Sequence, residues 1–197
     1  MLSNTVGIFH GYGGYRENSW LTWLNKQLLN KGITTIYPSF PFLGSSTIES
    51  WYEEFAKHKH LIKTPVSLVG HSAGTTFSLY TVQKNNIMYE KLILVCPLDD
   101  INGADMSGLL NRSGKESEIP FIRNFVHQHF DYELIQSRVK EFVFVLSDND
   151  PRVPYNETMN YFKKKINKAK FVTLHNAGHV NEKAGVTELP QVLEELL

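Results

Sequence analysis

The stretch "VSLVGHSAGTTFSLY" (residues 66–80) places a serine between two glycines, where an apolar strand-like run gives way to a helix-like one. The pattern Gly-x-Ser-x-Gly is weak by itself, because chance supplies it in roughly one chain of this length in twenty. Its context makes it specific: residues 65–70 predict a strand, and the apolar spacing from Ala73 onward predicts a buried helix. We therefore expect a sharp turn that presents Ser72 for nucleophilic attack. The alternative is a helix-capping serine after a glycine turn.

The residues around this serine favour a nucleophile on physical grounds. Gly70 and Gly74 have no Cβ atom, so the strand and the helix can approach closely around a strained serine. The serine hydroxyl would lie at a helix N-terminus, where the helix dipole and free N–H groups stabilise an anion. The N–H of Ala73 is therefore a candidate donor to an oxyanion.

Composition and charge narrow the class of protein. The chain has 197 residues, of which 42% are hydrophobic and 20% charged, as in an ordinary globular protein. Twenty basic and twenty acidic residues cancel, so we expect a small-molecule partner and neither nucleic acid nor a membrane. The single cysteine, Cys96, excludes an internal disulfide and fits a reducing compartment. The N-terminus does not resemble a signal peptide and no long apolar segment is present, so the predicted location is cytoplasmic.

Short β-branched or aromatic runs alternate with longer amphipathic ones along the chain. Six runs predict strands: residues 5–10, 32–38, 65–70, 91–97, 141–147 and 170–175. Six others predict helices: residues 18–30, 47–60, 73–84, 131–139, 155–166 and 187–196. Strands separated by helices predict an α/β fold, three-layer and doubly wound, with a mainly parallel sheet of about six strands. With a strand order of 2-1-3-4-5-6, ligands would bind outside the carboxyl ends of the first and third strands.

Residues 98–130 depart from this alternation. They carry Gly, Ser, Asn and charged residues where one crossover helix would suffice. A connection of that length is usually functional or mobile. We expect one domain over residues 1–197, with residues 98–130 as a cap or flap and not as a second domain.

A nucleophilic serine needs a base, and the base needs an acid that orients it. The stretch "DNDPRVP" (148–154) follows the fifth predicted strand and offers Asp148 and Asp150. The stretch "NAGHV" (176–180) follows the sixth and offers His179. The order serine, aspartate, histidine along the chain is that of the α/β-hydrolases.

Asp150 is the preferred acid. Pro151 fixes its own φ and pushes Asp150 toward an extended conformation, which aims its carboxylate in one direction. Asp148 is the runner-up, with turn capping as its other explanation. Asp99 and Asp100, after the fourth predicted strand, are a third choice.

Four parts of the chain resemble the α/β-hydrolase superfamily, in particular the small serine hydrolases of the retinoblastoma-binding protein nine and YdeN type. They are "FHGYGGYRENSWLTWL" (9–24), "YPSFPFL" (37–43) with "ESWYEEF" (49–55), "VGHSAG" (69–74), and "SDNDPRVP" (147–154) with "NAGHV" (176–180). The resemblance extends over about residues 6 to 180, and its most specific parts are the serine turn and the Asp-Pro-x-Val-Pro stretch.

This resemblance implies a minimal α/β-hydrolase fold that lacks the two N-terminal strands of larger members. It implies that the acid is Asp150, which precedes the proline. It also implies a second oxyanion N–H from the loop "HGYGG" (10–14), at Tyr12, although a simple strand-to-helix turn would have a similar sequence. In the same part of the protein we expect a substrate pocket lined by His10, Gly11 and Phe42.

We expect neither a metal ion nor an organic cofactor. Two His-x-His pairs lack further ligands in suitable places, so we interpret them as solvated side chains: His58 with His60, and His127 with His129. We expect His71 to pack beside the serine and His175 to be a buried or edge histidine. Cys96 should be buried in its strand, without a basic neighbour to make it reactive.

The predicted function is hydrolysis of small carboxylic ester-type substrates through an acyl-enzyme intermediate, with Ser72, His179 and Asp150 as a catalytic triad. Two alternatives remain open. The same triad would serve a peptidase or a thioesterase, and the scaffold would also serve a hydrolase-like binding protein without turnover. The sequence does not indicate the acyl group, the alcohol or the oligomeric state.

Overall fold

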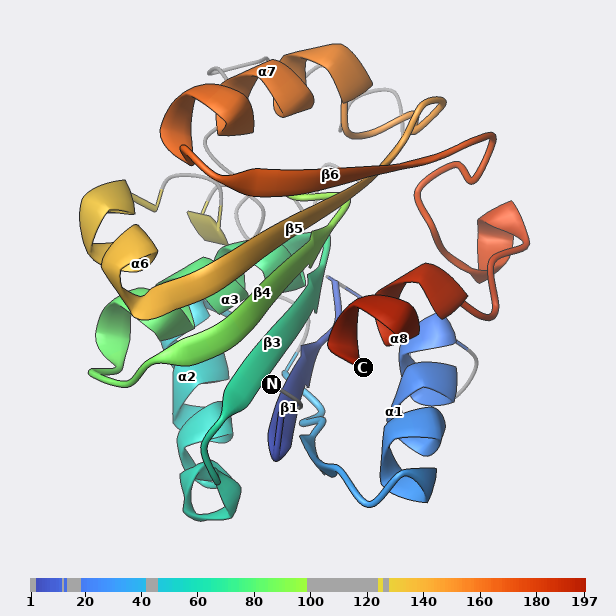
Figure 1. The fold of residues 1–197 in the computed structure, drawn as a ribbon. Coiled ribbons are helices and arrows are strands. Elements are labelled where there is room, and N and C mark those ends of the chain that lie inside the picture. The colour runs from blue at the N-terminus through green and yellow to red at the C-terminus, as the bar shows by residue number, and fades with distance from the viewer. Residues whose placement is uncertain (1–2, 12, 14–18, 42–45, 99–123, 126–127) are drawn as a thin grey trace.

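The computed structural model describes the chain except for residues 1–2, 12, 14–18, 42–45, 99–123 and 126–127. Six parallel strands form one sheet in the order β2-β1-β3-β4-β5-β6, with helices on both faces (Figure 1). The predicted fold class, the parallel sheet and the strand order are therefore confirmed. The strands are β1 (Thr5–Phe9), β2 (Thr34–Ile36), β3 (Val66–His71), β4 (Tyr89–Val95), β5 (Val139–Ser147) and β6 (Ala169–Leu174).

The six predicted helices also correspond to helices in the structure. They are α1 (Trp20–Asn30), α2 (Ile48–Ala56), α3 (Ala73–Lys84), α6 (Tyr132–Arg138), α7 (Tyr155–Lys165) and α8 (Pro190–Leu196), with short 3-10 turns at η1 (Lys59–Leu61) and η3 (Glu182–Ala184). Several boundaries differ from the prediction by a few residues: the strand predicted over 32–38 covers only Thr34–Ile36, and the helix predicted over 187–196 begins at Pro190. Two further differences have a clear local form. The helix predicted over 47–60 ends at Ala56, and η1 follows it as a separate turn. The strand predicted over 91–97 ends at Val95, because Cys96 takes a positive φ of 47° that a strand cannot contain.

The apolar strands are explained by burial on both faces of the sheet. In β5, Phe142 and Phe144 belong to one core cluster, whereas Val143 and Val145 belong to the other. The first cluster lies under α2, α3, α6 and α7, and the second lies under α1 and α8. Strands covered on both faces are near-continuous apolar runs, and each buried Val, Leu or Phe side chain stabilises the fold by about 1.5–3 kcal/mol.

The sheet changes winding direction between β1 and β3. These two strands are hydrogen-bonded neighbours, but the helix after β1 packs in one core cluster and the helix after β3 packs in the other. In doubly wound sheets the two loops then separate at the carboxyl ends of the strands, and ligands bind between them. The loop that begins at His10 and the turn at Ser72 both lie at this position.

Most of the predicted cap or flap, residues 98–130, lies outside the described residues. Its described ends contact the body of the protein: the Leu98 N–H donates to Thr75 Oγ1 at 3.0 Å, and the Phe125 ring lies 4.7 Å from that of Trp51. The single-domain organisation and the cap stay predictions. Among the helices of the described residues, none has the length and apolarity needed to cross a bilayer; the cytoplasmic location and the absence of nucleic-acid partners stay predictions as well.

The backbones of β1, β3 and α3 touch at two glycines. A Cβ atom built on Gly74 would lie 2.2 Å from the carbonyl oxygen of Phe9, and one built on Gly70 would lie 2.4 Å from the carbonyl oxygen of Gly74. Distances this short are not tolerated, so no other residue fits at either position without a shift of the backbone. This is the close approach that the sequence predicted around Ser72.

We expect Gly74→Ala to destabilise the protein by about 3 kcal/mol or more, because the new methyl group overlaps main-chain atoms of β1 that cannot turn away. Gly185→Ala is the matched control, since a Cβ atom there meets open space although φ is 79°; it should cost about 1–2 kcal/mol. Urea unfolding of both variants measures the difference. Equal destabilisation by the two substitutions would contradict this account of the packing.

Candidate active site

Ser72 lies in a strained turn between β3 and α3. Its φ of 54° and ψ of −123° are unfavourable for a residue with a side chain. The turn is held from both sides, because the Ser72 N–H donates to the Val95 carbonyl at 3.0 Å and the Ser72 carbonyl accepts from the Thr75 N–H at 2.8 Å. β3 ends at His71 and α3 begins at Ala73, so Ser72 alone connects the strand to the helix. This strand-turn-helix geometry is that of a nucleophile elbow.

The structure brings Ser72, His179 and Asp150 together. The Ser72 hydroxyl oxygen lies 3.0 Å from His179 Nε2, and His179 Nδ1 lies 2.8 Å from Asp150 Oδ2. The side chains of His179 and Asp150 are 5% and 1% exposed. A carboxylate only accepts hydrogen bonds, so Nδ1 carries the proton and Nε2 accepts from the serine hydroxyl. Ser72 and His179, which are 107 positions apart in the sequence, thus belong to one chain of hydrogen bonds that ends at Asp150.

Asp150 is fixed by its own turn. Its Oδ1 accepts hydrogen bonds from the backbone N–H groups of Arg152, at 2.8 Å, and Val153, at 3.1 Å. Burial by itself would raise the pKa of Asp150, but the hydrogen bond from His179 and the electrostatic interaction with that ring, together with the hydrogen bond from the Arg152 N–H, lower that pKa below its ordinary value. The carboxylate is therefore ionised at neutral pH and turned toward the imidazole.

The other predicted acids lie elsewhere. Asp148 Oδ2 lies 2.7 Å from Nδ1 of His175, and its Oδ1 accepts from the Asn176 N–H. The His175 side chain is 78% exposed and directly follows β6, the edge strand of the sheet, so of the two expectations for it, buried or at an edge, the first is wrong. Asp99 and Asp100 lie outside the described residues. Of the two carboxylates that follow β5, only Asp150 contacts His179.

The predicted oxyanion loop is described in part. Tyr12 and the pocket residue Phe42 lie outside the described residues, so their roles stay predictions. Gly11 passes beside Ser72: a Cβ atom on Gly11 would lie 3.0 Å from Cβ of Ser72. Ala73 is the first residue of α3, and it is buried.

His10 supports this loop from the core. Its Nδ1–H donates to the Gly11 carbonyl at 2.7 Å, and its Nε2 accepts from the Phe40 N–H at 3.2 Å. The ring is buried against those of Phe40 and Trp51. Both nitrogens thus contact the backbone, and the predicted contact of His10 or Gly11 with substrate stays a prediction.

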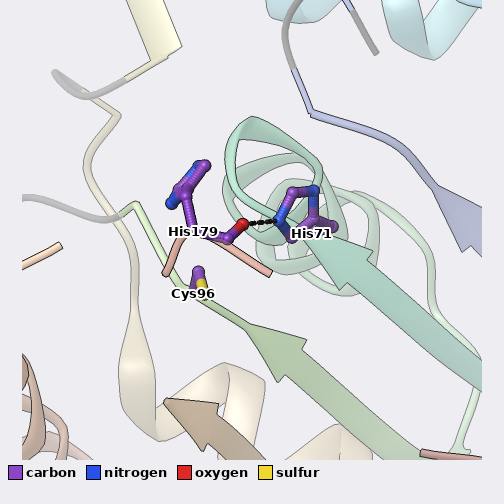
Figure 2. Close-up of side chains that lie close together, drawn as sticks. All are labelled: His71, Cys96 and His179. Atoms are coloured by element: carbon purple, nitrogen blue, oxygen red, sulfur yellow. Dashed lines mark hydrogen bonds between the residues drawn. The ribbon is translucent and has the colours of Figure 1, made fainter. Parts of the chain in front are cut away.

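The sequence analysis missed two neighbours of His179. Figure 2 shows His71, Cys96 and His179 gathered at the end of the sheet, with the His71 ring directed to the backbone carbonyl of His179. His71 Nε2 lies 3.0 Å from that carbonyl oxygen. Burial, followed by the electrostatic interaction with His179, lowers the pKa of His71 to about 3, so the His71 ring is neutral and its Nε2–H donates.

The sequence analysis expected no basic neighbour for Cys96. This expectation is wrong, because the fold brings two histidines close to its thiol. The ligand atoms of His71, Cys96 and His179 all lie within 4.8 Å of one another. Burial, followed by the nearby Asp150 carboxylate, raises the pKa of the Cys96 thiol well above its ordinary value. The thiol is therefore protonated and unreactive, as the sequence analysis expected for a different reason.

These three residue types could hold zinc in principle. The Nε2 of His71 and both ring nitrogens of His179 already bind protein atoms, however. Zinc also needs a thiolate, and burial keeps Cys96 protonated. A metal ion bound through Nε2 of His71 and one ring nitrogen of His179 would thus displace two hydrogen bonds, and the two histidines are better described as hydrogen-bonded neighbours.

Comparison with known proteins gives consistent results. Residues 6–197 match the sequence model of a family described as serine hydrolase. The chain is 24% identical to YdeN of Bacillus subtilis (strain 168) over 198 residues, which are 99% of this chain and 95% of that protein. The crystal structure of the YdeN gene product is similar, with a TM-score of 0.76 at 23% identity, over 98% of this chain and 96% of that one.

A second solved structure, Est1E from Butyrivibrio proteoclasticus with ferulic acid bound, has a TM-score of 0.66 at 18% identity, over 98% of this chain and 89% of that chain. A third solved structure, from a study of carboxylesterases of the thaumarchaeon Nitrososphaera gargenis, has a TM-score of 0.70 at 12% identity, over 98% of this chain and 88% of that chain. At these identities the structural likeness shows the fold.

The neutral state of His71 makes the stability of the protein depend on pH. In the unfolded chain His71 binds a proton below about pH 6.5, but in the folded protein it does so only near pH 3. Stability is therefore lost as the pH falls through this interval, and by pH 5 the loss is about 2 kcal/mol.

His71→Gln keeps an N–H that can reach the His179 carbonyl but cannot titrate. Between pH 7 and pH 5 we expect the free energy of unfolding of the variant to fall by about 2 kcal/mol less than that of the original protein. Urea unfolding at the two pH values tests this. The same pH dependence in both proteins would show that His71 is not a buried neutral histidine.

Proposed function

This chain belongs to the serine hydrolase family, and from that premise we propose that it cleaves small carboxylic esters with Ser72, His179 and Asp150 as its catalytic triad. The proposal rests on one observation: the His179 ring contacts both the Ser72 hydroxyl, at 3.0 Å, and the Asp150 carboxylate, at 2.8 Å. Both distances are within the hydrogen-bond reach that proton transfer requires.

The first half of the reaction forms the acyl-enzyme. As Oγ of Ser72 attacks the ester carbonyl carbon, His179 Nε2 takes the hydroxyl proton, and the carbonyl π electrons move onto oxygen. The Asp150 carboxylate stabilises the imidazolium that results. When the tetrahedral intermediate collapses, its bond to the alkoxide breaks, and His179 returns the proton to the leaving alcohol.

The second half repeats these steps with water. His179 removes a proton from water as the hydroxide oxygen bonds to the acyl carbon, and the bond to Ser72 then breaks. The carboxylic acid leaves and the serine regains its proton. Ser72 supplies the nucleophile of the first half of the reaction, and His179 carries out the proton transfers of both halves. The proposed reaction therefore uses neither a metal nor an organic cofactor.

The negative oxygen of the intermediate needs donors beside Ser72. We assign this role to the N–H groups of Ala73 and Tyr12. The position of Ala73 at the start of α3 supports the assignment, because a helix N-terminus carries partial positive charge and free N–H groups. The passage of Gly11 within contact distance of Ser72 supports it for the loop that contains Tyr12.

Ser72→Ala should lower kcat for p-nitrophenyl acetate by about 10⁴-fold or more while the protein stays folded, because no other group replaces the nucleophile. Ser78→Ala is the matched control: it removes another buried hydroxyl of α3, which donates to the Gly74 carbonyl. Its kcat should stay within about threefold. Undiminished hydrolysis by Ser72→Ala would refute the assignment of the nucleophile.

The same assay separates the alternatives. A peptidase with this triad would cleave p-nitroanilides as well as the more reactive esters, and a thioesterase would cleave acyl thioesters with a higher kcat/KM than matched oxygen esters. A hydrolase-like binding protein would turn over none of the three substrates. We expect the ester to have the highest kcat/KM and the p-nitroanilide not to be cleaved.

Asp150→Asn should lower kcat by about 10³–10⁴-fold, because the amide cannot stabilise the imidazolium of His179 and favours the wrong tautomer. Asp148→Asn is the matched control, since its amide oxygen can still accept from the Asn176 N–H at the protein surface. We expect its kcat to change by less than about fivefold. The reverse order of effects in steady-state kinetics would transfer the role of the acid to Asp148.

A further inference from the structure

The loop that carries His179 is held by a series of side chains that the proposed reaction does not use. Three consecutive N–H groups of this loop end on side-chain oxygens from the end of β5 and the residues after it. The Asn176 N–H donates to Asp148 Oδ1 at 2.9 Å, the Ala177 N–H to Ser147 Oγ at 3.2 Å, and the Gly178 N–H to Asn149 Oδ1 at 2.8 Å. The contact of His179 with Asp150 is the fourth in the series.

The backbone of this loop needs such support. Asn176, Gly178 and Val180 have φ values of 56°, 53° and 47°. Val180 is β-branched, and a positive φ in such a residue costs about 1–3 kcal/mol, so it persists only where its surroundings impose it. A loop in this conformation cannot bind its own N–H groups in a regular helix or strand, and side chains of the adjacent loop accept them instead.

Asn149 joins two of these contacts. Its Oδ1 accepts both the Gly178 N–H and the hydroxyl of Ser147, at 2.8 and 2.9 Å. Ser147 in turn accepts the Ala177 N–H and is fully buried. A single amide oxygen therefore fixes two successive backbone groups directly before His179. Asn149 also directly precedes Asp150, so the same pair of loops carries both the acid and the base.

We propose that Ser147 and Asn149 are positioning residues for His179: they hold its loop so that the ring spans Asp150 and Ser72. The inference rests on the proposed function, in which His179 must meet both partners at once. Positioning matters for the rate, because a displacement of a catalytic group by about 1 Å can lower the rate about 100-fold.

The outer contact of the series supplies a control. Asp148 also binds His175, but this pair is at the surface, with 34% and 78% of the side chains exposed. Exposed pairs of this kind contribute little. His175→Ala removes the imidazole and leaves the contacts of Ser147 and Asn149 in place.

The test compares Asn149→Ala, Asn149→Asp and His175→Ala with the original protein. Asn149→Ala removes the amide oxygen, and we expect kcat for p-nitrophenyl acetate to fall about 10- to 100-fold with KM within about threefold. Asn149→Asp keeps an acceptor oxygen at the same place and should recover most of this loss. His175→Ala should stay within about twofold. All kcat values are expressed per folded molecule, with the folded fraction taken from urea unfolding.

A second readout does not depend on turnover. The proton between His179 Nδ1 and Asp150 should give a low-field resonance in proton NMR spectra of the original protein, and this resonance should weaken or move in Asn149→Ala but not in Asn149→Asp or His175→Ala. An unchanged resonance in Asn149→Ala, or an Asn149→Asp variant as impaired as Asn149→Ala, would overturn the positioning role. Failure of the proposed function would give a different result: the original protein itself would hydrolyse no ester, with or without the low-field resonance.

Discussion

At Gly74 the backbone of α3 touches the Phe9 carbonyl of β1, and this contact decides where the helix can begin. Because no Cβ separates the two backbones, α3 starts at Ala73, directly after the serine. The chain must then reverse within a single residue, which explains the φ of 54° at Ser72. The same contact brings the loop of Gly11 beside the serine. Packing of strand against helix thus produces the strained turn in which Ser72 lies.

The sheet supplies the other parts of the site in an order that follows from its topology. β4 lies between β3 and β5, and β6 lies beside β5. The loops after β5 and β6 are therefore neighbours, and they bring Asp150 to His179. Burial keeps the adjacent His71 neutral and the adjacent Cys96 protonated. Among these groups Asp150 carries the charge that faces His179, which suits the stabilisation of a transient imidazolium.

The sequence allowed the fold to be predicted, and it indicated Ser72, Asp150 and His179 as candidates that the structure brings together, because each of these features is encoded locally. Ser72 lies at the end of an apolar run, Asp150 precedes a proline, and His179 follows a glycine after the last strand. The contacts of His71, Cys96 and Asn149 could not be predicted in this way. They depend on which loops become neighbours at the edge of the sheet, and on backbone conformations such as the positive φ of Cys96, which no local pattern in the sequence indicates.

The central claim is that His179 activates the Ser72 hydroxyl for attack on acyl compounds. Reaction of the protein with a fluorophosphonate, followed by mass spectrometry of the intact chain and of its peptides, tests this most directly. The account predicts one adduct per chain, on the peptide that contains Ser72, and no adduct in the His179→Ala variant. An adduct on another residue, or equal labelling of the two proteins, would contradict it.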